Sequence, residues 1–262
     1  VGSEMCIRDS ASLVSSQKIL NFDLQEIINS KILIDSPLNF DDLAIRLRKG
    51  ENQIITMDYF GELEPDINIV IYPHESVSGV KTYIGFDYVI IRKEFLEFSK
   101  ILKQESHADA AAVIILGGGD VLEQSSKAAK KLLEIGYSPT IIYGPTKSKE
   151  SLIEINAVTS LCNPKNYPQL IFEADLIISN CGGCMFESLF LNKPTFLLPQ
   201  TDKEESIAKA LFKSEELIVG MGMHNLSSLN PDTLAFKNPS SDSVIDGKGL
   251  QRISNILIGS YD

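Results

Sequence analysis

The sequence has no cluster of basic residues, no long apolar run and few cysteines. Its 262 residues carry 24 Lys and Arg against 35 Asp and Glu, for a formal net charge of −11. Binding to a phosphate backbone depends on gathered cationic side chains, so this balance argues against a nucleic-acid-binding protein. No apolar run approaches the roughly 20 residues that a membrane helix needs, and no integral membrane segment is expected.

The four cysteines and the lack of a secretory leader favour a reduced, cytoplasmic setting. The first residue is Val1, and residues 1–10 (VGSEMCIRDS) resemble cloning or sequencing leader material, so they are excluded from fold reasoning. Neither G-x-G-x-x-G nor the P-loop pattern G-x-x-x-x-G-K-[ST] is present. No Asp-x-Asp clamp stands near a glycine turn. We therefore expect no metal site and no cofactor.

Short apolar strands alternate with helices along two segments, which predicts an α/β fold of two Rossmann-type, doubly wound parallel-sheet domains. Residues 11–92 form the first domain, with strands at 31–35, 53–58 and 67–72 and a helix at 40–50 that ends on a glycine C-cap. These roughly 80 residues are few for a doubly wound domain, so the first domain is expected to be incomplete.

Residues 93–111 are charged and helical, and they are expected to form a linker. Residues 112–262 form the second domain, whose expected strands are 113–116, 140–143, 157–161, 176–178, 195–198 and 217–219. Helices are expected between them, and a last one at 246–257 is a candidate for packing back on the first domain.

Two glycine-rich turns follow strands of the second domain and are the main candidates for a ligand site. Gly117, Gly118 and Gly119 form the first, and the second runs from Ser179 through Asn180 to Gly182 and Gly183, at the start of a helix. A helix N-terminus carries free N–H groups and a partial positive charge, so phosphate is its natural ligand. Tight packing without a ligand is the alternative for each turn alone. Two turns at one sheet edge favour a nucleoside diphosphate.

Other side chains could carry chemistry at the carboxyl ends of the strands. Glu187, one turn into the helix, could accept hydrogen bonds from a ribose diol, and Gln200 could bind sugar hydroxyls. His74 and Asp58 are candidates for a general base, although surface or capping roles are more common. His224 is a further loop candidate for contacting the ligand.

Cys181 and Cys184 form a C-x-x-C at the helix start, where a redox pair or half of a zinc site is an alternative to small-residue packing. No second C-x-x-C and no pair of histidines completes a set of four zinc ligands. Small-residue packing is therefore the favoured interpretation.

The stretch LIISNCGGCMFESLFLNKPTFLLP resembles the sugar-nucleotide-binding motif of GT-B-fold glycosyltransferases. IGFDYVIIRKEF, VIILGGGD and DGKGLQRISNIL are similar to the family of the pseudaminic-acid-pathway UDP-sugar hydrolase and spore-coat polysaccharide proteins. The resemblance covers about residues 31–258 and implies a GT-B-like fold whose substrate is a UDP-sugar.

The resemblance also implies roles for particular residues. Gly117 to Gly119 and Gly182 to Cys184 would face the diphosphate, Glu187 would bind the ribose, and the backbone near Leu170 would bind the uracil. The family's G-x-G-H loop, whose histidine lies by the scissile bond, has no counterpart in this sequence.

The favoured expectation is hydrolysis of a UDP-linked diacetamido sugar in nonulosonic-acid or surface-polysaccharide synthesis. The alternatives are a GT-B glycosyltransferase with a UDP-sugar donor, and a non-catalytic sugar-nucleotide-binding protein or inactive fragment. The sequence names neither the sugar, nor the acceptor, nor an oligomeric state.

Overall fold

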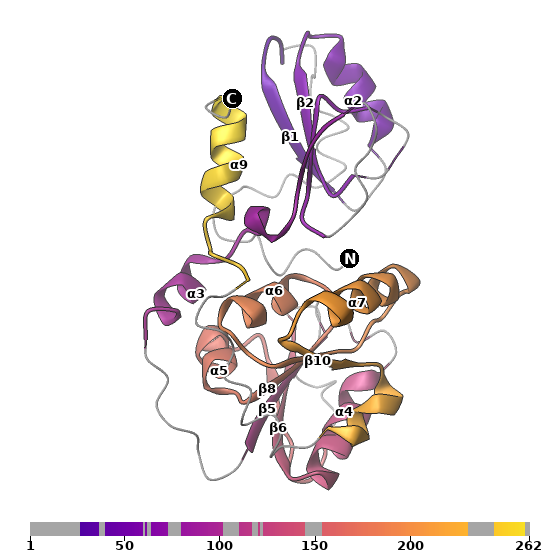
Figure 1. Cartoon of the computed structure of the whole chain (residues 1–262), viewed down its shortest axis with the longest axis vertical. Helices are drawn as coiled ribbons and strands as arrows, with labels where there is room; N and C mark the ends of the chain where they lie inside the picture. Colours follow the sequence, from indigo (N-terminus) through magenta and orange to yellow (C-terminus); the bar gives the residue numbers. More distant parts are fainter. Residues whose placement is uncertain are drawn as a thin grey trace. The chain divides into compact units, whose positions relative to one another are not determined.

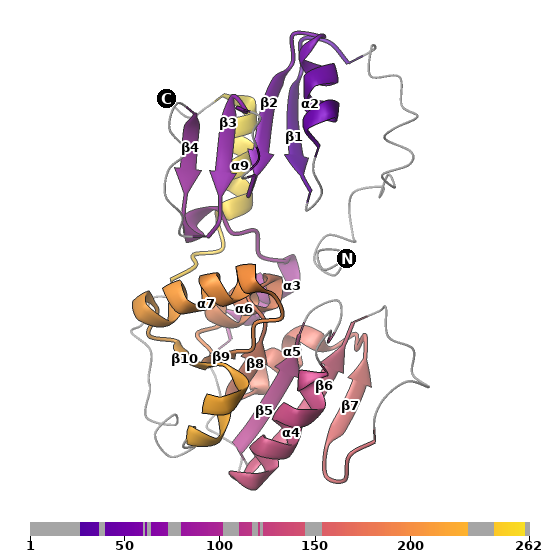
Figure 2. The same cartoon turned by 90° about the vertical axis from the view of Figure 1, so that its right-hand side faces the viewer.

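A computed structural model describes residues 27–36, 40–59, 61, 64–72, 80–101, 110–116, 120, 123–144, 154–229 and 244–259 (Figures 1 and 2). The chain divides into two compact units. The described part of the larger unit lies within residues 91–246. The smaller unit takes its described residues from 27–90 and from 247–259, so the chain returns to it at the end.

A six-stranded sheet forms the centre of the larger unit. Its order is β10-β9-β8-β5-β6-β7, and each neighbouring pair is parallel. Counted along the chain within this unit, the order is 3-2-1-4-5-6, which is the doubly wound Rossmann arrangement. The strands are β5 (Ala110–Ile115), β6 (Tyr137–Tyr143), β7 (Thr159–Cys162), β8 (Leu176–Ser179), β9 (Thr195–Leu197) and β10 (Ile218–Met221).

Helices cover both faces of this sheet, as Figure 1 shows with α4 on one side and α5 on the other. Helix α4 (Gln124–Glu134) presents Ala128, Ala129 and Leu132 to one face, where η4 (Met223–Ser228) adds Leu226 to the same core. Apolar side chains that recur about one helical turn apart lie on one side of a helix and form such a contact surface. The other elements are α3 (Lys93–Phe98), α5 (Tyr167–Glu173), α6 (Gly183–Phe190) and α7 (Asp202–Ser214).

The smaller unit contains a four-stranded parallel sheet in the simple order β1-β2-β3-β4. Its strands are β1 (Lys31–Asp35), β2 (Gln53–Met57), β3 (Ile67–Val70) and β4 (Lys81–Ile84). Successive side chains of a strand point to opposite faces. Accordingly Ile54 packs with helix α2 (Asp41–Arg48), whereas Ile55 packs with Ile253 and Ile256 of helix α9 (Gly249–Ile258).

The fold class predicted from the sequence is confirmed in that the chain contains two parallel-sheet α/β units. In the smaller sheet the strand order never reverses, so its described strands form one half of a doubly wound sheet. Strand β4 was not predicted, because KTYI is short and carries two polar residues. Helix α9 packs on the sheet of the smaller unit.

One local feature differs from the sequence-based expectation. The helix expected to end on a glycine C-cap instead ends with Lys49 in a right-handed conformation, and the left-handed residue is Glu51, at φ 56°. Gly50 is needed for close approach, since an added Cβ would lie 2.3 Å from the Ile27 carbonyl oxygen. The charged segment 93–111 was predicted to be helical, and it contains α3, whose Phe95 packs edge-on against Tyr167 of α5.

Candidate functional site

The candidate site lies where the strand order of the larger sheet reverses, between β5 and β8. These two strands are neighbours, with Ile115 opposite Ser179. The glycine-rich turns therefore leave adjacent strands at their carboxyl ends. Open α/β sheets bind ligands at this switch point, because the connections on either side diverge to opposite faces and leave a crevice. Gly117, Gly118 and Gly119 themselves lie outside the described residues.

The helix that follows the first turn is already capped by an anionic side chain. Asp120 accepts hydrogen bonds from the backbone N–H groups of Gln124, at 2.6 Å, and Ser125, at 2.8 Å. A carboxylate in this position satisfies two of the free N–H groups and occupies the positive end of the helix dipole. The N-terminus of α4 is thus less available to a phosphate than the sequence suggested.

The N-terminus of α6 differs, because its N-cap residue, Gly182, has no side chain with which to cap the helix. Gly182 has φ −109° and ψ −161°, which is extended backbone open to any residue. A Cβ added there would meet Asn180 at 3.4 Å, an ordinary van der Waals contact. Neither the backbone conformation nor the packing of the described chain requires glycine at this position.

Polar side chains surround this turn at the sheet edge. Asn180 donates to one carboxylate oxygen of Glu204 at 2.9 Å, and the backbone N–H of Gln200 donates to the other at 2.7 Å. The Gln200 side chain donates to Gln124 of α4 at 3.2 Å. The structure therefore brings together Asn180, Gly182 and Gln200, three of the residues singled out from the sequence.

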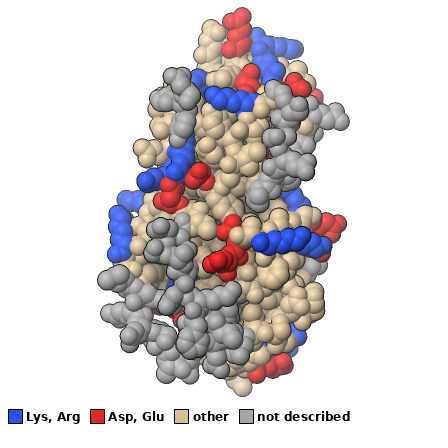
Figure 3. Space-filling view, viewed as in Figure 1, with Lys and Arg blue, Asp and Glu red and all other residues tan. Residues whose placement is uncertain are grey.

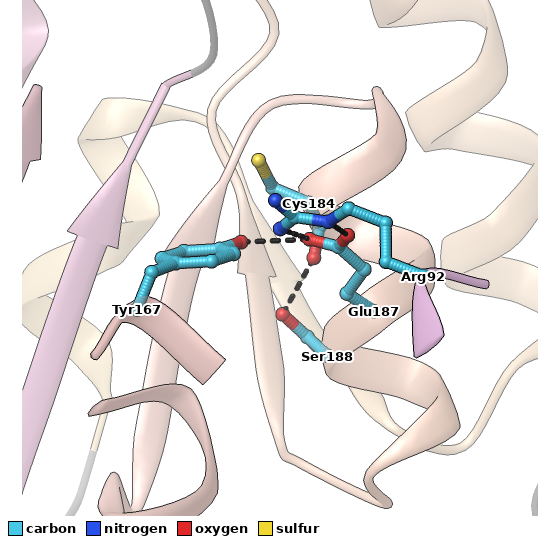
Figure 4. A network of polar contacts seen from close by, with 5 residues as sticks. All are labelled: Arg92, Tyr167, Cys184, Glu187 and Ser188. Carbon is cyan, nitrogen blue, oxygen red and sulfur yellow. Dashed lines mark hydrogen bonds and ion pairs between the residues drawn. The ribbon is translucent and has the colours of Figure 1, made fainter. Parts of the chain in front are cut away.

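Glu187 is buried within a network of hydrogen bonds and one ion pair (Figure 4). The Arg92 guanidinium donates to Oε1 through Nε at 2.6 Å and to Oε2 through Nη2 at 3.0 Å. The Tyr167 hydroxyl donates to Oε2 at 2.8 Å. Paired donation from a planar guanidinium fixes the plane of the carboxylate. Only 4% of the Glu187 side chain is exposed, against 32% for Arg92.

Burial governs the protonation of this network. It raises the pKa of Glu187 above its usual value, although hydrogen bonds from Arg92 and Tyr167 and the charge of Arg92 act in the opposite direction. Burial also raises the pKa of Tyr167 well above its usual range, so the phenol stays a donor.

The Cys181 thiol is a poor redox or metal-ligating group. It donates to the Glu204 carbonyl at 3.3 Å, and burial together with the Glu204 charge raises its pKa to about 12. Cys184 is also buried, and neither of the two cysteines forms a disulfide. Reactive cysteines and metal ligands need accessible thiolates, so small-residue packing is the better interpretation of the C-x-x-C. Among the described residues no group of three or more His, Cys, Asp and Glu could hold a metal ion.

Several remaining predictions lie elsewhere in the chain. His74 lies outside the described residues. Asp58 directly follows β2 with φ 47°, and its carboxylate accepts the backbone N–H of Ile71 at 2.8 Å. His224 lies in η4 and is exposed. Leu170 lies within α5, where its N–H donates to Asn166 and its carbonyl accepts from Ala174, so the carbonyl keeps one lone pair for a base.

Arg92 and Tyr167 were missed from the sequence. Both lie far along the chain from Glu187, and neither stands next to a glycine turn. The available signal was the quoted stretch IGFDYVIIRKEF, whose arginine directly precedes an apolar helix. A lone arginine at a helix start ordinarily indicates a solvated residue, and only the tertiary packing of α3 on α5 shows its partner.

The distribution of charge on the surface and the length and apolarity of the helices agree with what the composition indicates. On the face in Figure 3, Lys and Arg side chains are interspersed with Asp and Glu rather than gathered into one basic patch. Within the described parts of the chain, no helix combines the length and apolarity that crossing a membrane would require.

Two parallel-sheet α/β units, the larger of them doubly wound, form a GT-B-like fold. Solved structures with this fold align over almost the whole chain. MnaA of S. aureus, in a co-structure with UDP, gives a TM-score of 0.62 at 12% identity, covering 96% of this chain and 81% of MnaA. MurG of Acinetobacter baumannii gives 0.56 at 13% identity, covering 93% and 78%.

The spinosyn rhamnosyltransferase SpnG, complexed with thymidine diphosphate, gives 0.52 at 14% identity, covering 93% of this chain and 75% of SpnG. At these identities the likeness shows the fold alone. Among curated proteins, an uncharacterized protein of Methanocaldococcus jannaschii, MJ1062, is 26% identical over 132 residues, which are 46% of this chain and 27% of that protein. This match spans only about a quarter of the relative. No family model matches the chain.

Proposed function

We propose that this protein binds a UDP-sugar at the α6 N-terminus and acts as a glycosyltransferase of the GT-B type. The observation that carries the proposal is the glycine N-cap of α6 at the switch point, where neither packing nor backbone conformation requires Gly182 and the absent Cβ suits close approach of a ligand to the backbone. The N–H groups of a helix N-terminus and the positive end of the helix dipole favour a diphosphate there. The complexes of MnaA with UDP and of SpnG with thymidine diphosphate support a nucleoside diphosphate as the ligand class.

The spacing along α6 suits a nucleotide. Glu187 lies four residues after Gly183, which is about 6 Å along a helix axis. A diphosphate at the N-terminus would then have a carboxylate one helical turn away for the ribose, and Asn180 and Gln200 at the sheet edge for the sugar. Leu170 offers one carbonyl lone pair to the uracil.

In the proposed reaction the bond between the sugar C1 and the diphosphate oxygen breaks. An acceptor hydroxyl forms the new bond to C1, and its proton passes to a general base. Charge builds on the leaving diphosphate, and N–H groups at the helix N-terminus stabilise the transition state more than the ground state.

Hydrolysis is the second candidate, in which water replaces the acceptor hydroxyl. The motif stretches favour it, since they resemble the UDP-sugar hydrolase family, but the named transferase among the structural neighbours favours glycosyl transfer. A product assay separates them: free sugar indicates hydrolysis, and a glycosylated acceptor indicates transfer. Binding without either product indicates the non-catalytic alternative.

The binding site is tested by calorimetric titration with UDP, with and without magnesium, on the wild type and on Gly182→Ala. Alanine at this extended position is expected to destabilise the protein by less than about 1 kcal/mol, while its methyl group blocks the approach of a phosphate and weakens UDP binding tenfold or more. Undetectable heat at millimolar UDP, or unchanged affinity in a folded Gly182→Ala, would refute the proposed site.

A further inference from the structure

Arg92 donates two hydrogen bonds to Glu187, and its guanidinium also lies over two aromatic rings. Its guanidinium carbon lies 4.9 Å from the ring centre of Tyr167 and 5.2 Å from that of Phe95. Stacking on both rings fixes the guanidinium plane, and the paired donation transfers this fixed plane to the carboxylate. Figure 4 shows Arg92 and Tyr167 reaching Glu187 from different elements.

The contacts of Glu187 leave one acceptor position open. An ionised carboxylate has about four lone-pair sites, two on each oxygen. Oε2 accepts from Arg92 Nη2 and from Tyr167, whereas Oε1 accepts only from Arg92 Nε among the described residues. One lone pair of Oε1 is therefore open, in a direction set by the carboxylate plane.

We propose that Arg92 is a positioning residue that aims the open Oε1 lone pair of Glu187 and so makes nucleotide binding depend on a ribose hydroxyl. The proposal rests on the proposed function, because it assigns selectivity at the same site. It assigns Arg92 no contact with the ligand. The site then distinguishes ribonucleoside from deoxyribonucleoside diphosphates through the orientation of one buried carboxylate.

Without Arg92 this orientation is lost for two physical reasons. Rotation about the last side-chain torsion of a glutamate is broad, so a carboxylate held only by Tyr167 samples several planes. The hydrogen bonds and charge of Arg92 also lower the pKa of Glu187, against burial and the nearby charge of Glu94, which raise it. Removal of Arg92 therefore favours the protonated carboxyl, whose acceptor capacity is reduced.

A structural role alone makes a different prediction. If Arg92 only stabilises the packing of α3 on α5, its loss weakens the binding of every nucleotide by the same factor. A positioning role instead changes the ratio of affinities for nucleotides that differ in one hydroxyl. This ratio is independent of how much folded protein is present.

The test measures the dissociation constants of UDP, 2′-deoxy-UDP and 3′-deoxy-UDP by calorimetry. Charge-assisted hydrogen bonds predict that the wild type prefers UDP over at least one deoxy analogue by about tenfold to a hundredfold. In Arg92→Met this preference is expected to fall below about threefold, since the guanidinium is lost while an unbranched apolar side chain is kept. Arg92→Lys, a single point charge without the planar fork, should restore part of it.

Arg252→Met is the matched control, because it removes an arginine of the other unit that donates to the Asp87 carbonyl at 2.9 Å. It should keep the full preference for UDP. A wild-type preference that persists undiminished in Arg92→Met overturns the positioning role and leaves the proposed function intact. Absence of UDP binding in the wild type overturns both, and equal wild-type binding of all three nucleotides overturns the ribose contact and the positioning role together.

If Arg92→Met fails to fold, as judged by circular dichroism, Arg92→Lys decides the question. A preference at least severalfold below that of the wild type supports the proposal, and an unchanged preference overturns it.

Discussion

Replacement of Glu187 by alanine tests how much the buried network stabilises the larger unit. The substitution removes the acceptor of two Arg92 hydrogen bonds and of one from Tyr167. Removing one partner of a fully buried ion pair typically destabilises a protein by about 3–5 kcal/mol. Arg92 is 32% exposed, so water recovers part of its solvation, and we expect a loss of about 2–3 kcal/mol.

Smaller changes to the same network should cost less. Tyr167→Phe removes one neutral donor and is expected to destabilise the unit by about 1 kcal/mol. Glu187→Gln keeps the volume and one acceptor oxygen but places an amide N–H₂ near the guanidinium, so its effect should lie between those of the other two variants. The expected order of destabilisation is therefore Glu187→Ala, then Glu187→Gln, then Tyr167→Phe, because the variants lose successively fewer hydrogen bonds.

The measurement is amide hydrogen exchange of peptides from α6, followed by mass spectrometry. Local exchange suits a chain of two compact units, for which a single unfolding transition is not assured. A loss of 2–3 kcal/mol corresponds to exchange about 30- to 150-fold faster. Glu205→Ala is the control, because its partner Lys209 lies on the exposed side of α7, with 62% of the lysine side chain accessible, and α6 should exchange as in the wild type. Exchange less than threefold faster in Glu187→Ala would refute a stabilising network.

Two further predictions concern residues around the glycine turns. Asp120→Ala leaves two N–H groups of α4 without their acceptor and should destabilise the larger unit by about 1 kcal/mol in urea unfolding, whereas unchanged stability would mean that water replaces the cap fully. Cys181, with a pKa of about 12, should be only about one part in ten thousand thiolate at pH 8, so iodoacetamide should modify it far more slowly than Cys162, as measured by mass spectrometry. Equal rates would contradict its burial.

Much of the larger unit could be predicted from sequence, because parallel strands buried on both faces are continuous apolar runs. LIIS at β8 and AVII within β5 are such runs, and their glycine turns mark the connections to the following helices. The switch point itself depends on the strand order, in which β8 lies beside β5, and the apolar pattern does not give this order. The second turn could still be assigned to the carboxyl end of a strand, because it directly follows an apolar run.

Contacts between distant elements could not be predicted in this way. Periodicity identifies a side chain that faces a core, but not the partner that a charged residue meets there. Glu187 follows apolar residues in MFESL, and burial of a carboxylate requires a cation that local sequence does not identify. The partner, Arg92, comes from far along the chain, directly before the segment expected to be a linker. The role of Asp120 as a cap of helix α4 was also missed. Its carboxylate accepts the same N–H groups that a phosphate would bind, and the glycine-rich pattern does not distinguish the two.

The pH dependence of stability decides whether burial or Arg92 dominates the protonation of Glu187. Burial raises its folded-state pKa above 4.5, the value expected in the unfolded chain. Between 4.5 and the folded pKa, the folded protein holds a proton that the unfolded chain has released, so stability falls as pH rises through this window. Glutamine at position 187 has no titratable group, so the stability of Glu187→Gln lacks this decline with pH. In urea unfolding at several pH values above 4.5, the stability of the wild type relative to Glu187→Gln should therefore decrease with rising pH and then level off. A relative stability that increases with pH would mean that the Arg92 and Tyr167 hydrogen bonds outweigh burial and hold the carboxylate ionised.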